Sequence, residues 1–368
     1  KIVCNLAHKK NINQMKILVI QQKRIGDVLT STIICNNLKA KFPDAVIDYM
    51  CYPNSVDVLK ENPSIDNIIP LSNNVRKSTP SLFKFIFKIR SNKYDVVIDV
   101  YSKLETNLIA LFSGAKYKVS YRKWYTKAFY NYTYERLDAV ESEHGLAIEN
   151  RLMLLKPLIS EKITNVKPKI FLKDSEINNA KNLLKSHQVD PEKPLIMFGI
   201  LGSETYKTYP LEGMAKIIDF TVAKTKGTII FNYVPFQKDL ALEVYNYCNE
   251  ETKKHIILDL YSTELREFLA LLSQCEMLIG NEGGAVNMAK ALDVPTFSIF
   301  TPSVRKETWQ LFENEAKNAS IHLKDLKPEI YQQFTEQQIK DRTFEYYAEY
   351  PLDLMLEKLA TYFKEYKN

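Results

Sequence analysis

The chain has few cysteines and histidines for its 368 residues, and neither type is clustered. The five cysteines, Cys4, Cys35, Cys51, Cys248 and Cys275, form no C-x-x-C pair. An odd and scattered set argues against a disulfide framework and against a zinc site. The five histidines are equally scattered, so we expect no metal site. This cysteine usage is typical of a reducing compartment and predicts a cytoplasmic protein.

Long hydrophobic runs are also missing. No apolar run approaches the ~20 residues needed to span a bilayer, so we predict no transmembrane segment. Residues 1–14 are basic but contain no long apolar stretch, which makes them a poor signal peptide. Because Met15 stands directly before the first predicted strand, we expect this leading segment to lie outside the core fold.

Positive charge is unevenly distributed along the chain. Residues 1–165 hold 25 Lys and Arg against 15 Asp and Glu, a net charge of +10, whereas residues 166–368 hold 25 against 29, a net of −4. A basic first half indicates an anionic partner, either nucleic acid or a phosphate-bearing lipid surface. A solvated lysine-rich surface is the structural alternative. No nucleic-acid reader motif accompanies the charge, so we expect no nucleic-acid partner.

Strand-like apolar runs alternate with helical patterns, and the alternation occurs twice. This pattern is typical of α/β proteins with parallel sheets covered on both faces, so we predict two doubly wound, Rossmann-like domains facing each other across a cleft. The domains are predicted at 15–165 and 166–334, followed by C-terminal helices at 335–368 that pack back. The predicted strands are Ile17–Ile20, Val46–Tyr52, Asn67–Leu71, Asp95–Tyr101, Tyr117–Tyr121, Leu195–Leu201, Thr228–Tyr233, His255–Leu260, Met277–Gly280 and Thr296–Phe300. Further helices are predicted at Ser175–His187, Thr335–Ala348 and Leu352–Tyr366.

The turn after the first predicted strand places one carboxylate, Asp27, at the carboxyl end of a sheet, where ligands of such folds bind. A helix is expected from Leu29 to Phe42. On local grounds alone Asp27 is more readily interpreted as a helix cap than as a catalyst. The single glycine of the turn, Gly26, is far short of a G-x-G-x-x-G dinucleotide fingerprint.

A second turn, at residues 278–289, runs from a strand through Gly283 and Gly284 into a helix. The two glycines let a ligand approach the backbone, and the helix start offers free N–H groups to a phosphate. Glu282 could bind ribose hydroxyls there, as acidic residues do in other nucleotide sites. The alternative is a tight turn in which Glu282 is only an exposed cap.

A third segment, residues 198–210, ends a strand in a glycine- and hydroxyl-bearing loop, with Lys207 just before a helix opened by Pro210. A lysine in that position can neutralise a diphosphate. Loop lysines are more often only solvated, so this segment indicates little by itself.

Together these segments resemble glycosyltransferase family nine, the lipopolysaccharide heptosyltransferase family with the GT-B fold. The resemblance is carried by KILVIQQKRIGDVLTSTIICNNLKAKFPDAVIDYM at residues 16–50 and by LIGNEGGAVNMAKALDVPTFSIFTPS at residues 278–303. Lys207-Thr208-Tyr209-Pro210 and the stretch His144–Asn150 add to it. The commoner family motif reads Asp-Thr-Gly and then histidine where this chain has Glu282-Gly283-Gly284 and Asn287.

The resemblance implies an inverting, metal-independent transferase that moves heptose or a related sugar from a nucleotide-diphosphate donor such as ADP-heptose. It implies no cofactor. Asp27 matches the catalytic base, and Lys207 matches the lysine that stabilises the departing diphosphate. Ser203, Glu282, Gly283, Gly284 and Asn287 are the implied donor-binding residues of the second domain.

The acceptor implied for the first domain is an anionic glycolipid, such as a lipopolysaccharide core, at the inner-membrane surface. The predicted acceptor-binding residues are the basic Arg24, Arg122, Lys123 and Lys127, beside which Trp124 and Tyr125 could stack on sugars. Such an acceptor would make the protein peripheral to the membrane. A stripe within Leu82–Phe87 could touch a membrane as well, although we favour an ordinary core-facing helix.

Two other functions stay open from the sequence. Nucleotide-sugar epimerases of the same fold also bind a diphosphate in the second domain. The second alternative is a protein that has kept the fold but lost catalysis, and that only binds a nucleotide sugar or a glycolipid. The Arg24–Asp27 turn favours transfer over epimerisation, and the presence of Asp27 and Lys207 argues against a loss of catalysis.

Overall fold

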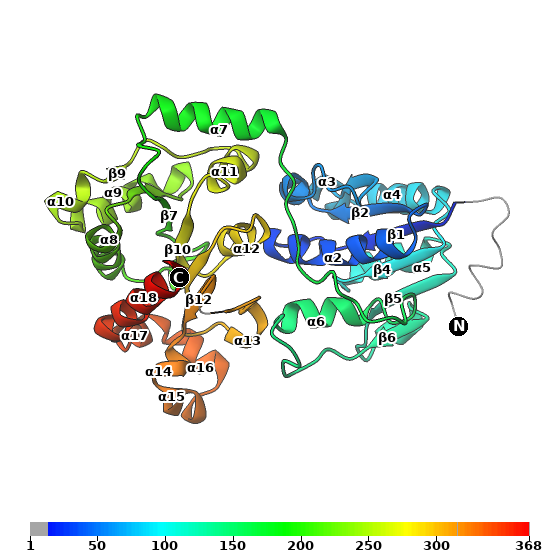
Figure 1. Ribbon diagram of the computed structural model, residues 1–368. Helices are drawn as coiled ribbons and strands as arrows, with labels where there is room; N and C mark the ends of the chain where they lie inside the picture. The colour runs from blue at the N-terminus through cyan, green and yellow to red at the C-terminus, as the bar shows by residue number, and fades with distance from the viewer. Residues whose placement is uncertain (1–13, 315, 368) are drawn as a thin grey trace. The chain divides into compact units, whose positions relative to one another are not determined.

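The computed structural model describes residues 14–314 and 316–367 and divides the chain into two compact units (Figure 1). Unit 1 ends at Phe171 and unit 2 begins at Leu172, six residues beyond the predicted boundary. Cys4 lies outside the described residues. The other four cysteines are buried and unpaired.

Unit 1 contains a parallel sheet of six strands in the order β3-β2-β1-β4-β5-β6. This order is that of a dinucleotide-binding fold, with its switch point between β1 and β4. The strands are β1 (Lys16–Ile20), β2 (Val46–Cys51), β3 (Asn67–Pro70), β4 (Val96–Asp99), β5 (Tyr117–Tyr121) and β6 (Tyr132–Tyr134). The helices are α2 (Ile25–Lys41), α3 (Asn73–Lys77), α4 (Thr79–Ser91), α5 (Leu104–Phe112) and α6 (Leu146–Met153), with short 3-10 helices η1 (Pro53–Val58) and η2 (Thr126–Ala128).

The two faces of this sheet are covered by different helices. Because side chains alternate along a strand, Leu18 and Ile20 pack with Ile86 of α4 and Ile109 of α5 in one hydrophobic cluster. On the other face α2 and α6 lie side by side. There Tyr49 donates to the Val28 carbonyl of α2. Strand β1 is therefore buried on both faces, which explains its uninterrupted apolar sequence.

Unit 2 repeats the same topology, with six parallel strands in the order β12-β11-β10-β7-β8-β9. Its switch point lies between β7 and β10. The strands are β7 (Leu195–Gly199), β8 (Thr228–Phe231), β9 (Ile256–Ile257), β10 (Met277–Asn281), β11 (Thr296–Ile299) and β12 (Asn318–Ile321). The helices are α7 (Asp174–Ser186), α8 (Leu211–Thr225), α9 (Lys238–Tyr247), α10 (Glu250–Lys253), α11 (Leu265–Leu272), α12 (Gly284–Ala291), α13 (Lys306–Trp309), α14 (Leu323–Leu326), α15 (Pro328–Gln333), α16 (Glu336–Asp341), α17 (Thr343–Ala348) and α18 (Leu352–Lys367), with single turns η3 (Thr205–Lys207) and η4 (Pro235–Gln237).

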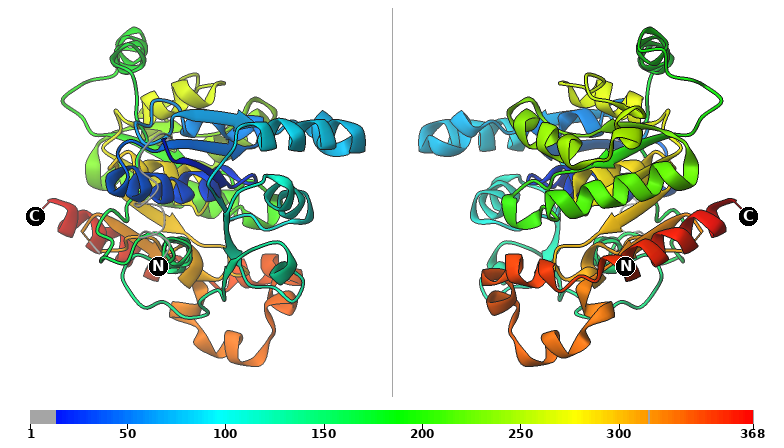
Figure 2. Two further views of the ribbon diagram at one scale, coloured as in Figure 1. Left: turned by 90° about the vertical axis from the view of Figure 1, so that its right-hand side faces the viewer. Right: turned by 90° about the vertical axis from the view of Figure 1, so that its left-hand side faces the viewer.

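The C-terminal helices belong to the core of unit 2. Met355, Leu359 and Tyr362 of α18 are buried in the same cluster as the strands of the sheet. Helix α18 lies beside α8 and β12, as its red ribbon shows in Figure 2. The segment after residue 334 therefore completes unit 2 and is no separate domain.

The ten predicted strands are all present, but two further strands, β6 and β12, were missed. Strand β12 reads Asn-Ala-Ser-Ile and lacks an apolar run, and β6 has only three residues. The predicted tail helix at Thr335–Ala348 is split into α16 and α17. None of the helices among the described residues is long and apolar enough to cross a membrane.

The core-facing interpretation of α4 was only half right. Ile86 and Ile89 are buried, and Leu82 and Phe85 pack against the core. Phe83 and Phe87 are exposed on the outer side of the same helix.

Candidate active site

The turn that carries Asp27 leads directly from β1 into α2. Helix α2 begins at Ile25, earlier than predicted, so Asp27 lies within its first turn. The N-cap residue is Arg24, and no side chain caps the helix, so the alternative interpretation of Asp27 as a helix cap is not supported. Arg24 has a φ of 62°, a left-handed conformation that costs a non-glycine residue about 1 kcal/mol or more.

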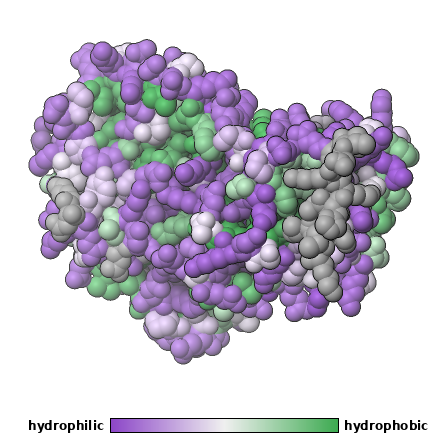
Figure 3. Space-filling view, turned by 45° about the vertical axis from the view of Figure 1, so that its right-hand side comes forward, coloured by the Kyte–Doolittle hydropathy of each residue, from purple (hydrophilic) through white to green (hydrophobic). Residues whose placement is uncertain are grey.

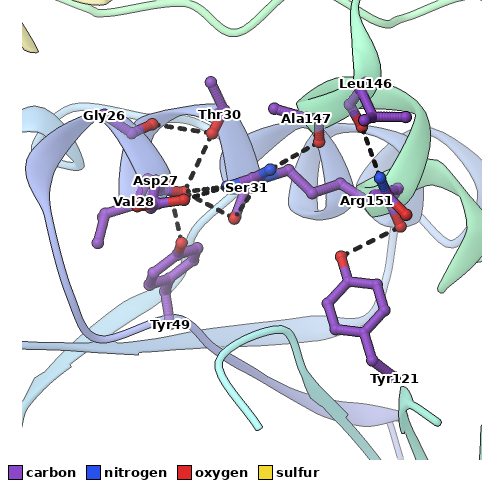
Figure 4. A network of polar contacts seen from close by, with 11 residues as sticks. Gly26, Asp27, Val28, Thr30, Ser31, Tyr49, Tyr121, Leu146, Ala147 and Arg151 are labelled. Atoms are coloured by element: carbon purple, nitrogen blue, oxygen red, sulfur yellow. Dashed lines mark hydrogen bonds and ion pairs between the residues drawn. The ribbon is translucent and has the colours of Figure 1, made fainter. Parts of the chain in front are cut away.

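Asp27 is held by an arginine from a distant helix. The Arg151 guanidinium of α6 donates through Nη2 to the Asp27 carboxylate at 2.9 Å (Figure 4). Its Nε donates to Ser31 Oγ at 2.8 Å, and its Nη1 donates to the Ala147 carbonyl at 2.6 Å. Ser31 Oγ in turn donates to the Asp27 carbonyl at 2.7 Å. Each nitrogen of the guanidinium therefore has a partner, and the carboxylate is fixed in direction.

The two members of this ion pair differ in exposure. The Arg151 side chain is 7% exposed, whereas that of Asp27 is 27% exposed. A buried cation that orients a partly open carboxylate leaves that carboxylate accessible to a substrate hydroxyl. Such a group can act as a general base once a hydroxyl lies within hydrogen-bond distance.

Helix α6 is anchored by the two residues before Arg151. The carboxylate of Glu149 accepts from the backbone N–H groups of Glu141 and Ser142. The carbonyl of Asn150 accepts from the hydroxyl of Tyr121, at the end of β5, at 3.1 Å. Glu149 and Asn150 belong to the stretch His144–Asn150 that contributed to the resemblance. Their contacts hold helix α6 in place and thereby fix the position of Arg151. Sequence reasoning missed Arg151 because a single arginine on a short helix gives no sign of its partner.

The predicted acceptor-binding residues lie at the same edge of the unit 1 sheet but are not all free. Arg24 and Lys127 are exposed. Arg122 forms an ion pair with Glu135 at 3.2 Å. Lys123 donates to the Ser102 carbonyl, and burial lowers the pKa of its ammonium group.

An aromatic pair lies within this basic loop. Trp124 is 92% exposed, and its ring meets that of Tyr125 edge to face, with centroids 5.3 Å apart. A tryptophan this exposed presents its ring to solvent, as a sugar-stacking residue must.

In unit 2, Ser203 and Lys207 lie in the loop after β7. Lys207 ends the single turn η3, and its Nζ lies 5.9 Å from the centroid of the Tyr206 ring. Gly202 is required by packing, since a Cβ there would lie 2.5 Å from the carbonyl oxygen of Lys207. Ser203 is exposed and lines a pocket of about 430 Å³ that includes Tyr209, Phe236 and Phe344.

Asn281, the last residue of β10, connects this loop to the second turn. Its Oδ1 accepts from the Tyr209 N–H at 2.8 Å, and its Nδ2 donates to the Gly199 carbonyl at 3.0 Å. A second link joins Thr301 Oγ1 to the carbonyl of Tyr206 at 3.0 Å. The structure therefore brings the Lys207 loop and the Glu282 turn together. Sequence reasoning missed Asn281, although it stands next to Glu282.

The predicted donor-binding turn has an open backbone. A Cβ at Gly283 would meet no atom within 4 Å, and one at Gly284 would meet only Met288 at 3.9 Å. These two glycines therefore satisfy no packing need of the protein, and the space above the start of α12 is free for a ligand. Asn287 is buried, and its amide donates to the Gly283 carbonyl at 3.3 Å.

A buried lysine lies behind this turn. Lys290 of α12 donates to the Leu311 carbonyl at 2.7 Å. Burial lowers the pKa of its ammonium group to about 8, against the opposing effect of Glu313 and Glu282. No group of three or more His, Cys, Asp or Glu side chains that could hold a metal ion was found among the described residues.

The model of glycosyltransferase family 9 (heptosyltransferase) matches residues 82–339. The chain belongs to this family. The match includes Arg151, Lys207 and Glu282, whereas Asp27 precedes it. The resemblance inferred from the sequence is confirmed.

Individual relatives agree with the family. The chain is 22% identical to lipopolysaccharide heptosyltransferase 3 of Escherichia coli over 281 residues, 75% of this chain and 80% of that protein. Among solved structures, a glycosyl transferase family 9 protein from Veillonella parvula gives a TM-score of 0.71 at 18% identity, covering 90% of this chain and 97% of that chain. The E. coli ADP-heptose lps heptosyltransferase II gives 0.66 at 18% identity, covering 95% and 99%.

These findings make the protein a glycosyltransferase with a GT-B-like fold. Membership of the family favours transfer over the epimerase and the non-catalytic alternatives.

Proposed function

We propose that this glycosyltransferase moves a heptose or a related sugar from a nucleotide-diphosphate donor to a lipopolysaccharide core or related glycan. ADP-heptose is the first donor to test, because a similar solved structure is named as an ADP-heptose heptosyltransferase. The proposed reaction inverts the anomeric centre in one displacement and uses no metal.

The observation that carries this proposal is the Asp27–Arg151 pair at the carboxyl end of β1. Asp27 takes the proton of the acceptor hydroxyl while the acceptor oxygen forms a bond to the anomeric carbon. The bond between that carbon and the diphosphate oxygen breaks, and the nucleoside diphosphate leaves with the electron pair. Arg151 is a positioning residue here, since it aims the carboxylate and does not touch the substrate.

The leaving group gains negative charge as this bond breaks, so it needs a cation and hydrogen-bond donors. Lys207 supplies the cation, and the free N–H groups at the start of α12 supply the donors. Glu282 binds the ribose, and the open backbone at Gly283 and Gly284 lets the phosphates approach. Ser203 and Asn287 complete the proposed donor site.

The acceptor is proposed to be an anionic glycolipid at the cytoplasmic surface of the inner membrane. The net charge of +10 on residues 1–165 supports this assignment. Arg24, Arg122, Lys123 and Lys127 bind its phosphate or carboxylate groups, and Trp124 stacks on a sugar ring.

The test is acceptor-dependent release of ADP from ADP-heptose, compared between the wild type and Asp27→Asn. The amide keeps the shape of the side chain but cannot take a proton, so kcat is expected to fall by about 10³-fold. Asp44→Asn is the matched control, because Asp44 is an exposed aspartate of the same unit. Unchanged kcat in Asp27→Asn would refute the role of Asp27.

Two further measurements on the wild type test the proposed inversion of the anomeric centre and the proposed independence of metal. The anomeric configuration of the product should be opposite to that of the donor, and activity should survive a metal chelator. Retention of configuration, or loss of activity that added Mg²⁺ restores, would contradict the proposed displacement. Epimerised donor sugar formed without acceptor would favour an epimerase instead.

A further inference from the structure

Helices α4 and α5 present aromatic and basic side chains on the outer side of unit 1. On α4, Phe83 is 46% exposed and Phe87 is 66% exposed. They are four residues apart and therefore neighbours on the helix surface, and exposed Lys84 and Lys88 follow them with the same spacing. Phe112, at the end of α5, is 43% exposed.

These residues form one continuous surface. Helices α4 and α5 pack side by side, and Arg90 of α4 donates to the Phe112 carbonyl at 3.3 Å. We name Phe83, Lys84, Phe87, Lys88, Arg90 and Phe112 the α4–α5 surface. In Figure 2 α4, in sky blue, lies at the outer margin of unit 1, and in Figure 3 hydrophobic side chains lie among hydrophilic ones on this unit.

The core does not require these aromatic side chains. Ile86 and Ile89 already fill the inward side of α4, and Ile109 fills that of α5. Phe83, Phe87 and Phe112 each leave a large part of the ring exposed in the isolated chain, and a group of such side chains on one surface indicates a partner that covers them.

The charge around this surface specifies the partner. Residues 73–118 contain nine Lys and Arg against three Asp and Glu. The three acidic groups are all engaged, since Asp99 is buried, Glu105 pairs with Arg76 at 3.0 Å, and Asp95 accepts from the Lys16 N–H. The exposed charge of this stretch is therefore almost entirely positive, and Lys84, Lys88 and Arg90 lie on the same helix as the exposed Phe83 and Phe87.

We propose that the α4–α5 surface docks on an anionic lipid bilayer. Phenylalanine side chains insert at the boundary between headgroups and acyl chains, and the flanking lysines attract anionic headgroups. Because the helix lies in the plane of the interface, no membrane-spanning segment is needed. This proposal rests on the membrane location given under the proposed function and assigns that location to a defined surface. Membrane binding by this surface can be tested without donor or acceptor.

The experiment measures co-sedimentation of the full chain with vesicles of phosphatidylcholine alone and of phosphatidylcholine mixed with phosphatidylglycerol. The wild type should bind the mixed vesicles and not the neutral ones, and added salt should weaken the binding. The double variants Phe83→Ser/Phe87→Ser and Lys84→Glu/Lys88→Glu should each lower the partition coefficient by about tenfold or more.

Matched controls are available in unit 2. Phe236→Ser/Phe344→Ser removes two other exposed phenylalanines, and Lys181→Glu/Lys185→Glu reverses two exposed lysines with the same spacing on α7. Both controls should bind mixed vesicles as the wild type does. All variants replace exposed side chains, and thermal unfolding checks that each is folded.

Three results would overturn the proposal. The first is absence of wild-type binding to mixed vesicles. The second is binding by the α4 variants that equals binding by the wild type. The third is a loss of binding in the unit 2 controls as large as the loss in the α4 variants. A wild-type dimer that Phe83→Ser/Phe87→Ser converts to a monomer would assign this surface to a second copy of the chain instead. Transfer to a delipidated, water-soluble acceptor should be unchanged in the α4 variants. Failure of the proposed reaction would therefore remain distinguishable from failure of the membrane proposal.

Discussion

The two sheets have the same strand order, yet the carboxyl ends of their central strands are built differently. In unit 1 a buried guanidinium, Arg151, fixes the carboxylate of Asp27. In unit 2 the corresponding edge has two glycines with free space above them, at Gly283 and Gly284. A fixed charge suits proton transfer, whereas open backbone suits phosphate binding. One topology therefore carries two different arrangements at its edge, and the two proposed chemistries differ because the residues placed there differ.

After the loss expected for Asp27→Asn, the largest effect should come from removing the cation of unit 2. Lys207→Met removes the proposed positive charge beside the leaving diphosphate, so kcat should fall by about 10²- to 10³-fold. The matched control is Lys340→Met, because Lys340 Nζ also lies over the Tyr206 ring, at 5.4 Å from its centroid. Steady-state kinetics with saturating donor measures both. Equal losses in the two variants would mean that the charge around Tyr206, and not Lys207 itself, is needed.

The second prediction concerns the stability of unit 1. Arg151→Met leaves Asp27 without its buried partner and should lower the free energy of unfolding by about 3 kcal/mol in denaturant titration. Arg122→Met breaks an ion pair whose side chains are 49% and 75% exposed, so it should cost less than about 1 kcal/mol. Similar values for both variants would show that the Asp27–Arg151 pair contributes no more than a surface pair.

The third prediction is a pH dependence in unit 2. The folded-state pKa of Lys290 is lowered to about 8 from 10.5, so between these values the unfolded chain holds a proton that the folded chain has lost. The contribution of Lys290 to the free energy of unfolding should therefore rise by about 2 kcal/mol from roughly pH 8 to 10, and it is measured as the difference between the wild type and Lys290→Met, because the buried cysteines oppose it equally in both chains. Lys290→Met should lack this rise. Parallel curves for the wild type and Lys290→Met would show that Lys290 titrates normally.

The smallest effect is expected from glycine substitutions, which should distinguish a glycine in open space, Gly283, from a glycine required by packing, Gly202. Gly283→Ala adds a methyl group where the protein has space, so stability should be unchanged while the KM for the donor rises about tenfold. Gly202→Ala should cost about 2 kcal/mol of stability, because its Cβ would clash with the Lys207 carbonyl oxygen. An unchanged donor KM in Gly283→Ala would place the phosphates elsewhere.

Sequence reasoning predicted most of the architecture and the loops that carry the candidate residues. Apolar runs such as Ile17–Ile20 must be buried on both faces, so their pattern is clear locally. The same reasoning failed for Arg151 and Lys290, whose partners lie far along the chain and are set by packing. It also assigned Phe83 and Phe87 to the core, because an apolar stripe looks the same whether protein or another partner covers it.

The position of Asn281 limits how this enzyme can be re-engineered. Its amide bonds to both Tyr209 and Gly199, so the loop with Lys207 and the turn with Glu282 share one support. A loop exchanged from a relative at this place would have to offer an N–H and a carbonyl at the same two positions. Loop swaps intended to change the donor sugar should therefore move residues 199–210 and 280–287 as one unit.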